Sequence, residues 1–191
     1  LTLTSLIPKF VKTTCQGIVE TVEKNILEFK KEELLGHVGI VFQDFESQLF
    51  STNVELEIAF LPENLGLDQK EIKERCQAII RLFNLTTLQK RNVLTLSGGE
   101  KQRLAIASVL SGSPKIIIMD DPTTDLDPLG KKMVFDLISK IGGTKILVEN
   151  EPERVFEADR VMIMNEGKII ASGKPDEILG NNQLLLDNCI K

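Results

Sequence analysis

A short apolar run that ends in two acids constrains the fold of this chain more than any other stretch. Residues 116–119 read Ile-Ile-Ile-Met, and Asp120, Asp121 and Pro122 follow. A run without polar alternation is typical of a strand buried on both faces, as in a parallel sheet. Open α/β sheets bind ligands at the carboxyl ends of their strands, where these acids would lie. One carboxylate there can hold Mg²⁺, and the next can orient or deprotonate an attacking water. Taken alone, the pair also fits two solvated acids in a turn.

A second stretch, upstream of this run, has the features of a helix start that can face a ligand. Ser97 and Glu100 have the spacing of a capping box, with two glycines between them. Apolar residues then recur with helical spacing at Leu104, Ala107, Val109 and Leu110. Glycine leaves the backbone bare, and a helix N-terminus presents N–H groups at the positive end of its dipole, so this turn suits an anion such as phosphate. Taken alone, it reads equally as a plain helix start.

Strands and helices alternate along the rest of the chain. Helices are predicted at residues 30–36, 69–83, 131–141, 153–158 and 177–186, and the segment 69–83 has the clearest apolar stripe. Strands are predicted at residues 17–20, 38–42, 144–148, 160–164 and 168–171, the last two as a hairpin and 144–148 as a buried strand. This alternation predicts an α/β fold with a parallel sheet.

Bulk composition excludes several classes of protein. A formal net charge of −5 gives no reason to expect nucleic acid, whose binding faces are basic, so we expect no nucleic-acid partner. No apolar run approaches the ~18 residues that a membrane span needs. The three cysteines, Cys15, Cys76 and Cys189, lie far apart and form neither a disulfide framework nor a zinc spacing. The 191 residues suffice for one domain with a real core.

Four motifs stand in the order and spacing of an ABC ATPase domain. They resemble the Q-loop at Gln43, the signature motif at residues 96–102, the Walker B strand at 116–122 and the D-loop at 123–128. The amino-acid sequence of residues 39–50 and 60–67 is similar to that of the ATPase subunits of energy-coupling factor transporters, the cobalt and vitamin importers. The resemblance covers nearly the whole chain.

This resemblance implies a P-loop NTPase-type parallel sheet core with an inserted α-helical subdomain. The core would comprise residues 1–43 and 112–175, the helical subdomain with the Q-loop and signature motif residues 44–111, and a C-terminal helix residues 176–191. Residues 5–8 resemble the end of the helix that follows the family's P-loop. The first strands and the P-loop are therefore missing from this sequence, and we expect a longer polypeptide or another segment to complete the sheet.

The resemblance also implies roles for individual residues. ABC ATPases bind ATP between two domains arranged head to tail, with the P-loop and Walker B of one facing the signature helix of the other. Asp120 would hold Mg²⁺, with Gln43 near the metal and the attacking water. The residues expected to contact the nucleotide or the dimer seam are Ser97, Gly98, Gly99, Glu100 and Asp127.

Two positions depart from the family pattern. Asp121 stands where the catalytic glutamate is usual, and its carboxylate is about one methylene nearer the backbone, enough displacement to cost about 100-fold in rate. Glu149 stands where a switch histidine is usual, and an ionised glutamate cannot donate a hydrogen bond to the γ-phosphate. With an intact signature, this predicts a degenerate half that completes a competent partner's ATP site.

The expected function is that of the ATP-binding subunit of an energy-coupling-factor-like importer, coupling ATP binding and hydrolysis to uptake of a small nutrient. Its partners would be a second ABC ATPase domain and a transmembrane subunit, at the cytoplasmic face of the cell membrane. Docking candidates are Phe45, Leu49, Phe50 and Phe60, which equally fit the core of the helical lobe. The alternatives are a soluble ABC ATPase acting in DNA maintenance or translation, and a non-hydrolysing interaction domain.

Overall fold

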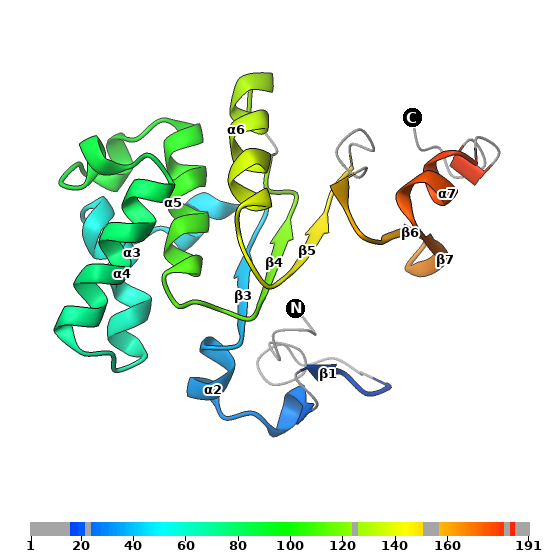
Figure 1. Ribbon diagram of the computed structural model, residues 1–191, viewed down its shortest axis with the longest axis horizontal. Coiled ribbons are helices and arrows are strands. Elements are labelled where there is room, and N and C mark those ends of the chain that lie inside the picture. The colour runs from blue at the N-terminus through cyan, green and yellow to red at the C-terminus, as the bar shows by residue number, and fades with distance from the viewer. Residues whose placement is uncertain (1–15, 22–23, 124–125, 151–156, 182–183, 186–191) are drawn as a thin grey trace. The chain divides into compact units, whose positions relative to one another are not determined.

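The computed structural model describes residues 16–21, 24–123, 126–150, 157–181 and 184–185 (Figure 1). The chain forms two compact units, Leu1–Val148 and Glu149–Lys191, which are described separately. The expectation for residues 5–8 and most of the helix predicted at 153–158 lie outside the described residues.

A parallel sheet of three strands forms the centre of the first unit. Its order is β3 (Val38–Val41), β4 (Ile116–Asp120) and β5 (Thr144–Val148), and Figure 1 shows the three arrows pointing the same way. The predicted α/β fold with a parallel sheet is therefore confirmed. Because the strands run parallel, their carboxyl ends meet at one edge of the sheet.

Burial differs between the middle strand and its neighbour. Ile117, Ile118 and Met119 of β4 are buried, as the apolar run predicts. The bounds predicted for β5 are correct, but its predicted burial is wrong, since none of its residues is buried and Val148 is 50% exposed. The physical reason is position: in the described sheet β5 is an edge strand, covered less than the central one.

A helical lobe stands in the chain between β3 and β4. It contains α3 (Val54–Asn64), α4 (Gln69–Leu82) and α5 (Gly98–Leu110), with the short turns η3 (Phe45–Gln48), η4 (Thr86–Leu88) and η5 (Val93–Thr95). Helix α5 packs against α3, α4 and β3, so the lobe and the sheet share one core. Asp68 caps α4 by accepting hydrogen bonds from the N–H groups of Lys70 and Glu71, both at 2.9 Å.

Short elements precede the sheet. Strands β1 (Glu20–Thr21) and β2 (Lys24–Asn25) pair antiparallel, and η2 (Ile26–Glu28) and α2 (Lys31–Leu35) follow. The helical turn predicted at 30–36 is confirmed. The strand predicted at 17–20 is wrong except for its last residue, because Gly17 has a φ of 108°, which interrupts an extended strand.

Among the described residues, the elements that remain are α6 in the first unit and β6, β7 and α7 in the second. Helix α6 (Pro128–Ser139) contributes Val134, Leu137 and Ile138 to the core of the first unit. In the second unit β6 (Val161–Asn165) and β7 (Lys168–Gly173) form the predicted hairpin, with α7 (Pro175–Leu179) after it. Of the closing helix predicted at 177–186, residues 177–179 belong to α7, which begins earlier, at Pro175, and ends before Gly180. The prediction of one continuous helix is wrong at residues 180–181, residues 184–185 are helical, and residues 182–183 and 186 lie outside the described residues.

Candidate nucleotide-binding site

The start of α5 is a complete capping box. The Ser97 N–H donates to Glu100 Oε2 at 2.7 Å, and the Glu100 N–H donates to Ser97 Oγ at 3.4 Å. The first of these hydrogen bonds lowers the pKa of Glu100. Glu100 is therefore occupied in shaping the turn, which is the interpretation that its spacing from Ser97 predicts.

The backbone of this turn is accessible. Ser97 and Gly98 are exposed, and a Cβ built on Gly98 would have no atom within 4 Å. At Gly99 a Cβ would meet only Leu126 Cδ2, at 3.9 Å. The first N–H groups of a helix have no partner within the helix, so an accessible, bare first turn can receive an anion.

The acids after β4 lie in different environments. Asp120 is the last residue of the strand and is exposed. Asp121 is half-buried, and its N–H donates to the Val148 carbonyl oxygen at 2.9 Å. Its φ is 47°, in the left-handed region that aspartate tolerates better than most residues. The backbone therefore fixes the direction in which Asp121 leaves the sheet.

Gln43 lies at the same edge as these acids. It is exposed and follows β3 two residues after Val41, which pairs with Met119 of β4. The register thus brings Gln43 and Asp120 to one edge of the sheet. Glu149 is half-buried and is the first residue of the second unit.

Asp127 has a structural role, as the N-cap of α6, that we did not predict from the sequence. Its Oδ1 accepts a hydrogen bond from the Gly130 N–H at 2.6 Å and caps α6. The signal was present in the sequence, since an aspartate followed by proline is typical of a helix start. The role of Asp127 at a dimer seam stays a prediction, and Thr124 and Asp125 of the same motif lie outside the described residues.

An ion pair links the signature helix to the segment after Gln43. Lys101 Nζ lies 2.6 Å from Glu46 Oε2, and the Lys101 side chain is only 16% exposed. Gln48 ties the same segment to β3, because its Oε1 accepts from the Phe42 N–H at 2.8 Å and its Nε2 donates to the Ile40 carbonyl at 3.1 Å. No short-range pattern predicts contacts across such separations in sequence.

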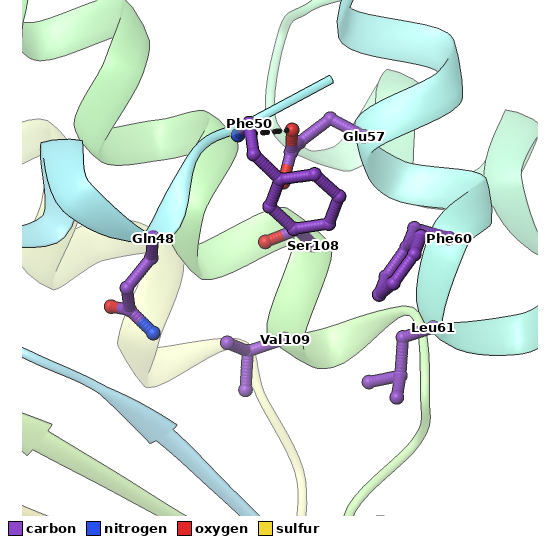
Figure 2. A pocket seen from close by; sticks show the side chains of 7 residues that line it. All are labelled: Gln48, Phe50, Glu57, Phe60, Leu61, Ser108 and Val109. Atoms are coloured by element: carbon purple, nitrogen blue, oxygen red, sulfur yellow. Dashed lines mark hydrogen bonds between the residues drawn. The ribbon is translucent and has the colours of Figure 1, made fainter. Parts of the chain in front are cut away.

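A small hollow lies beside η3, between α3 and α5. Figure 2 shows its lining side chains, which are Gln48, Phe50, Glu57, Phe60, Leu61, Ser108 and Val109. Glu57 is buried, and its Oε2 accepts from the N–H groups of Phe50 at 3.1 Å and Ser51 at 2.7 Å. The ring of Phe50 meets that of Phe60 edge-on, with centroids 4.6 Å apart.

The four apolar docking candidates divide into two groups. Phe50 and Phe60 are 62% and 45% exposed, so they are available to a partner. Phe45 and Leu49 are partly buried against the core, which fits the alternative role of filling the lobe. Sequence alone does not separate these groups, because all four residues are apolar.

The donor chemistry at the sheet edge suits a metal ion shared with phosphate. Among the residues that the structure describes there is no cluster of three or more His, Cys, Asp or Glu side chains able to hold a metal alone. Mg²⁺ is usually held by one or two carboxylates together with phosphate oxygens and water. Asp120 has a carboxylate and Gln43 an amide oxygen at this edge, and their role as Mg²⁺ ligands stays a prediction. None of the described helices is long and apolar enough to cross a membrane.

Comparison with known proteins identifies the family. The family model described as ABC transporter matches residues 2–124. The chain belongs to the ABC transporter ATP-binding family. This membership implies a nucleotide-binding domain, in agreement with the bare turn of α5 and the acids after β4. A solved structure of cbiO1 from Clostridium perfringens, described as part of the ABC transporter complex cbiONQ, matches with a TM-score of 0.78 at 30% identity, covering 90% of this chain and 71% of that one.

Relatives of this ABC domain differ in length. An ABC transporter ATP-binding protein of Caldanaerobacter subterraneus is 46% identical over 187 residues, which are 96% of this chain and 33% of the relative. An ABC transporter ATP-binding protein of Pyrococcus abyssi is 40% identical over a stretch that covers 97% of this chain and 68% of the relative. EcfA1 of Clostridium novyi, an energy-coupling factor transporter ATP-binding protein, is 38% identical over a stretch that covers 94% of this chain and 64% of the relative. The chain thus spans about a third of the first of these relatives.

Proposed function

We propose that this chain is the ATP-binding part of an energy-coupling-factor-like importer, which couples ATP binding and hydrolysis to uptake of a small nutrient. The observation that supports this proposal is that one chain has both features of a nucleotide site. The first turn of α5 is accessible and contains two glycines, and acids lie at the carboxyl edge of a parallel sheet. The names of the relatives from Clostridium novyi and Clostridium perfringens support the transporter class.

The two parts of the site would serve two nucleotides in a head-to-tail pair of ABC domains. Ser97, Gly98 and Gly99 would meet the γ-phosphate held by the partner domain, with Glu100 keeping the turn in shape. Asp120 and Gln43 would hold Mg²⁺ on the nucleotide of this domain. When bound, that ion would neutralise phosphate charge. Asp127, which caps α6, would lie at the seam between the domains.

The site at the sheet edge is proposed to be the weaker of the two. Asp121 would orient the attacking water with a shorter side chain than glutamate, and its left-handed backbone fixes its direction. Glu149 would bring negative charge towards the γ-phosphate instead of a hydrogen-bond donor. We therefore propose that this chain chiefly completes the site of a competent partner.

A transmembrane subunit would dock beside the hollow at η3, at the inner face of the membrane. Phe50 and Phe60 offer exposed aromatic surface there, and aromatic residues are enriched at protein interfaces. The buried Glu57 holds the backbone that carries Phe50, so the docking surface has a fixed shape. Lys101 and Glu46 connect this surface to the signature helix.

The proposal is tested by placing a bulky cation at the signature turn. In a heterodimer with an unaltered partner, Ser97→Arg is expected to abolish single-turnover ATP hydrolysis at the partner's site, because the side chain fills the space for the γ-phosphate. The matched control is Ser139→Arg, at an exposed serine at the end of α6. Undiminished hydrolysis in the Ser97→Arg heterodimer would refute the proposal.

A further inference from the structure

Three polar side chains follow the capping box of α5, and they differ in what they contact. Gln102 is 0% exposed, and its amide has no hydrogen-bond partner among the described residues. Arg103 joins the first turn of α5 to the end of α4, because its Nε donates to the Gly99 carbonyl and its Nη1 to the Phe83 carbonyl, both at 3.3 Å. Of the three, Lys101 reaches η3.

Lys101 contacts the signature turn at one end and η3 at the other. Its backbone N–H donates to the Ser97 carbonyl at 2.9 Å, which closes the first turn of α5. Its Nζ lies 2.6 Å from Glu46 Oε2, and the side chain is only 16% exposed. A lysine side chain that is mostly enclosed needs a partner of opposite charge for its ammonium group. Because one residue makes both contacts, the position of Ser97 depends on that of Glu46.

Glu46 belongs to a turn that is fixed to the sheet. Gln48, also in η3, joins this turn to β3 and the residue after it through both ends of its side-chain amide. The Ser47 hydroxyl donates to the Asp44 carbonyl at 2.8 Å, which holds the start of η3 directly after Gln43. The ion pair therefore connects the start of the signature helix to the segment that follows Gln43 at the sheet edge.

The exposure of the two partners indicates what this ion pair contributes. The Glu46 side chain is 55% exposed, so its charge stays largely solvated and the pair adds little to stability. The contact still has a defined direction, because the lysine is enclosed. Displacements of about 1 Å at a reacting group can cost about 100-fold in rate. A contact of this kind therefore matters more for geometry than for stability.

We propose that Lys101 and Glu46 are positioning residues, which hold the start of α5 where Ser97, Gly98 and Gly99 meet the γ-phosphate on the partner domain. This inference deepens the proposed function and rests on it. The ion pair acts on the rate of hydrolysis at the partner's site more than on the affinity for nucleotide, because in the proposed pair of domains the partner's own groups hold the nucleotide.

The test reverses the charges in the heterodimer with an unaltered partner. Lys101→Glu places two carboxylates side by side, so single-turnover ATP hydrolysis at the partner's site is expected to fall at least about tenfold. The affinity for Mg-ATP and the thermal unfolding midpoint should change little, since the exposed Glu46 can turn to solvent. Lys101→Glu combined with Glu46→Lys restores an ion pair and should recover most of the lost hydrolysis. Lys101→Arg keeps the charge and should stay close to the parent.

The matched control is Lys90→Glu, which reverses the charge of another lysine of the helical lobe that pairs with a glutamate, Glu55, and is 82% exposed. This variant should hydrolyse ATP at the rate of the parent. If Lys101→Glu does not fold, Lys101→Met and Glu46→Gln take its place, because each removes one charge and each should lower hydrolysis.

The outcomes separate this inference from the proposed function. Unchanged hydrolysis in Lys101→Glu would overturn the inference, as would a double variant no more active than the single one. A loss of hydrolysis matched by an equal loss of Mg-ATP affinity or of stability would mean that the pair only maintains the fold, and would also overturn it. A parent heterodimer that hydrolyses no ATP, or whose hydrolysis is insensitive to Ser97→Arg, would overturn the proposed function together with the inference.

Discussion

Replacing Glu57 should loosen the loop that carries Phe50. Glu57 is 3% exposed as a residue, and its carboxylate accepts hydrogen bonds from the N–H groups of Phe50 at 3.1 Å and Ser51 at 2.7 Å. Hydrogen bonds to a charged acceptor contribute more than neutral ones, so Glu57→Leu is expected to lower the free energy of unfolding by about 2–3 kcal/mol after allowance for the partly solvated loop. Glu57→Gln keeps one uncharged acceptor and should cost about 1 kcal/mol.

Urea denaturation followed by circular dichroism measures these differences. A loss of 2–3 kcal/mol corresponds to a fall in melting temperature of about 4–12 °C for a chain of this size. The matched control is Glu63→Gln, an exposed glutamate on the same helix, which should change stability by less than about 0.5 kcal/mol. If Glu57→Leu were as stable as this control, the two hydrogen bonds would not hold the loop, and the argument for a pre-shaped docking surface would be wrong.

Three further predictions concern the site. Glu100→Ala removes half of the capping box and should lower the free energy of unfolding, measured by urea denaturation at pH 7, by about 1 kcal/mol. The folded-state pKa of Glu100 is lowered, so its contribution to stability is present above the unfolded pKa and should disappear as the pH falls through the folded pKa. Asp121→Glu combined with Glu149→His should raise phosphate release by the complex at least about tenfold, and an unchanged rate would contradict the degenerate-site argument. Phe50→Asp should weaken binding to the transmembrane subunit at least about tenfold with little change in melting temperature, since the side chain is 62% exposed.

Local patterns predicted the central features of this structure well. The apolar run before Asp120 forms the central strand, since a run without polar alternation is typical of a strand covered on both faces. The apolar stripe of α4 gave its bounds to within one residue, and the capping box at Ser97 lies where its spacing indicates. These features depend on neighbours in sequence, which is why sequence alone sufficed.

Features that depend on distant partners could not be predicted in this way. Glu57 has the sequence context of an exposed helical glutamate, and only the folded loop reveals its buried carboxylate. The ion pair between Lys101 and Glu46 joins the signature helix to a turn far away in the chain. The unpaired amide of Gln102 likewise follows from packing, which decides whether a polar residue on a helix is solvated or enclosed.

In the sheet formed by the described residues β5 lies at the edge, and this position affects how these residues behave in isolation. An apolar edge strand offers a row of backbone donors and acceptors along one side, and such edges promote intermolecular strand pairing. Ile146, Leu147 and Val148 supply the apolar surface that makes this contact favourable. We expect these 191 residues, when expressed alone, to self-associate as concentration rises, and charged substitutions on the outer side of β5 to keep them monomeric.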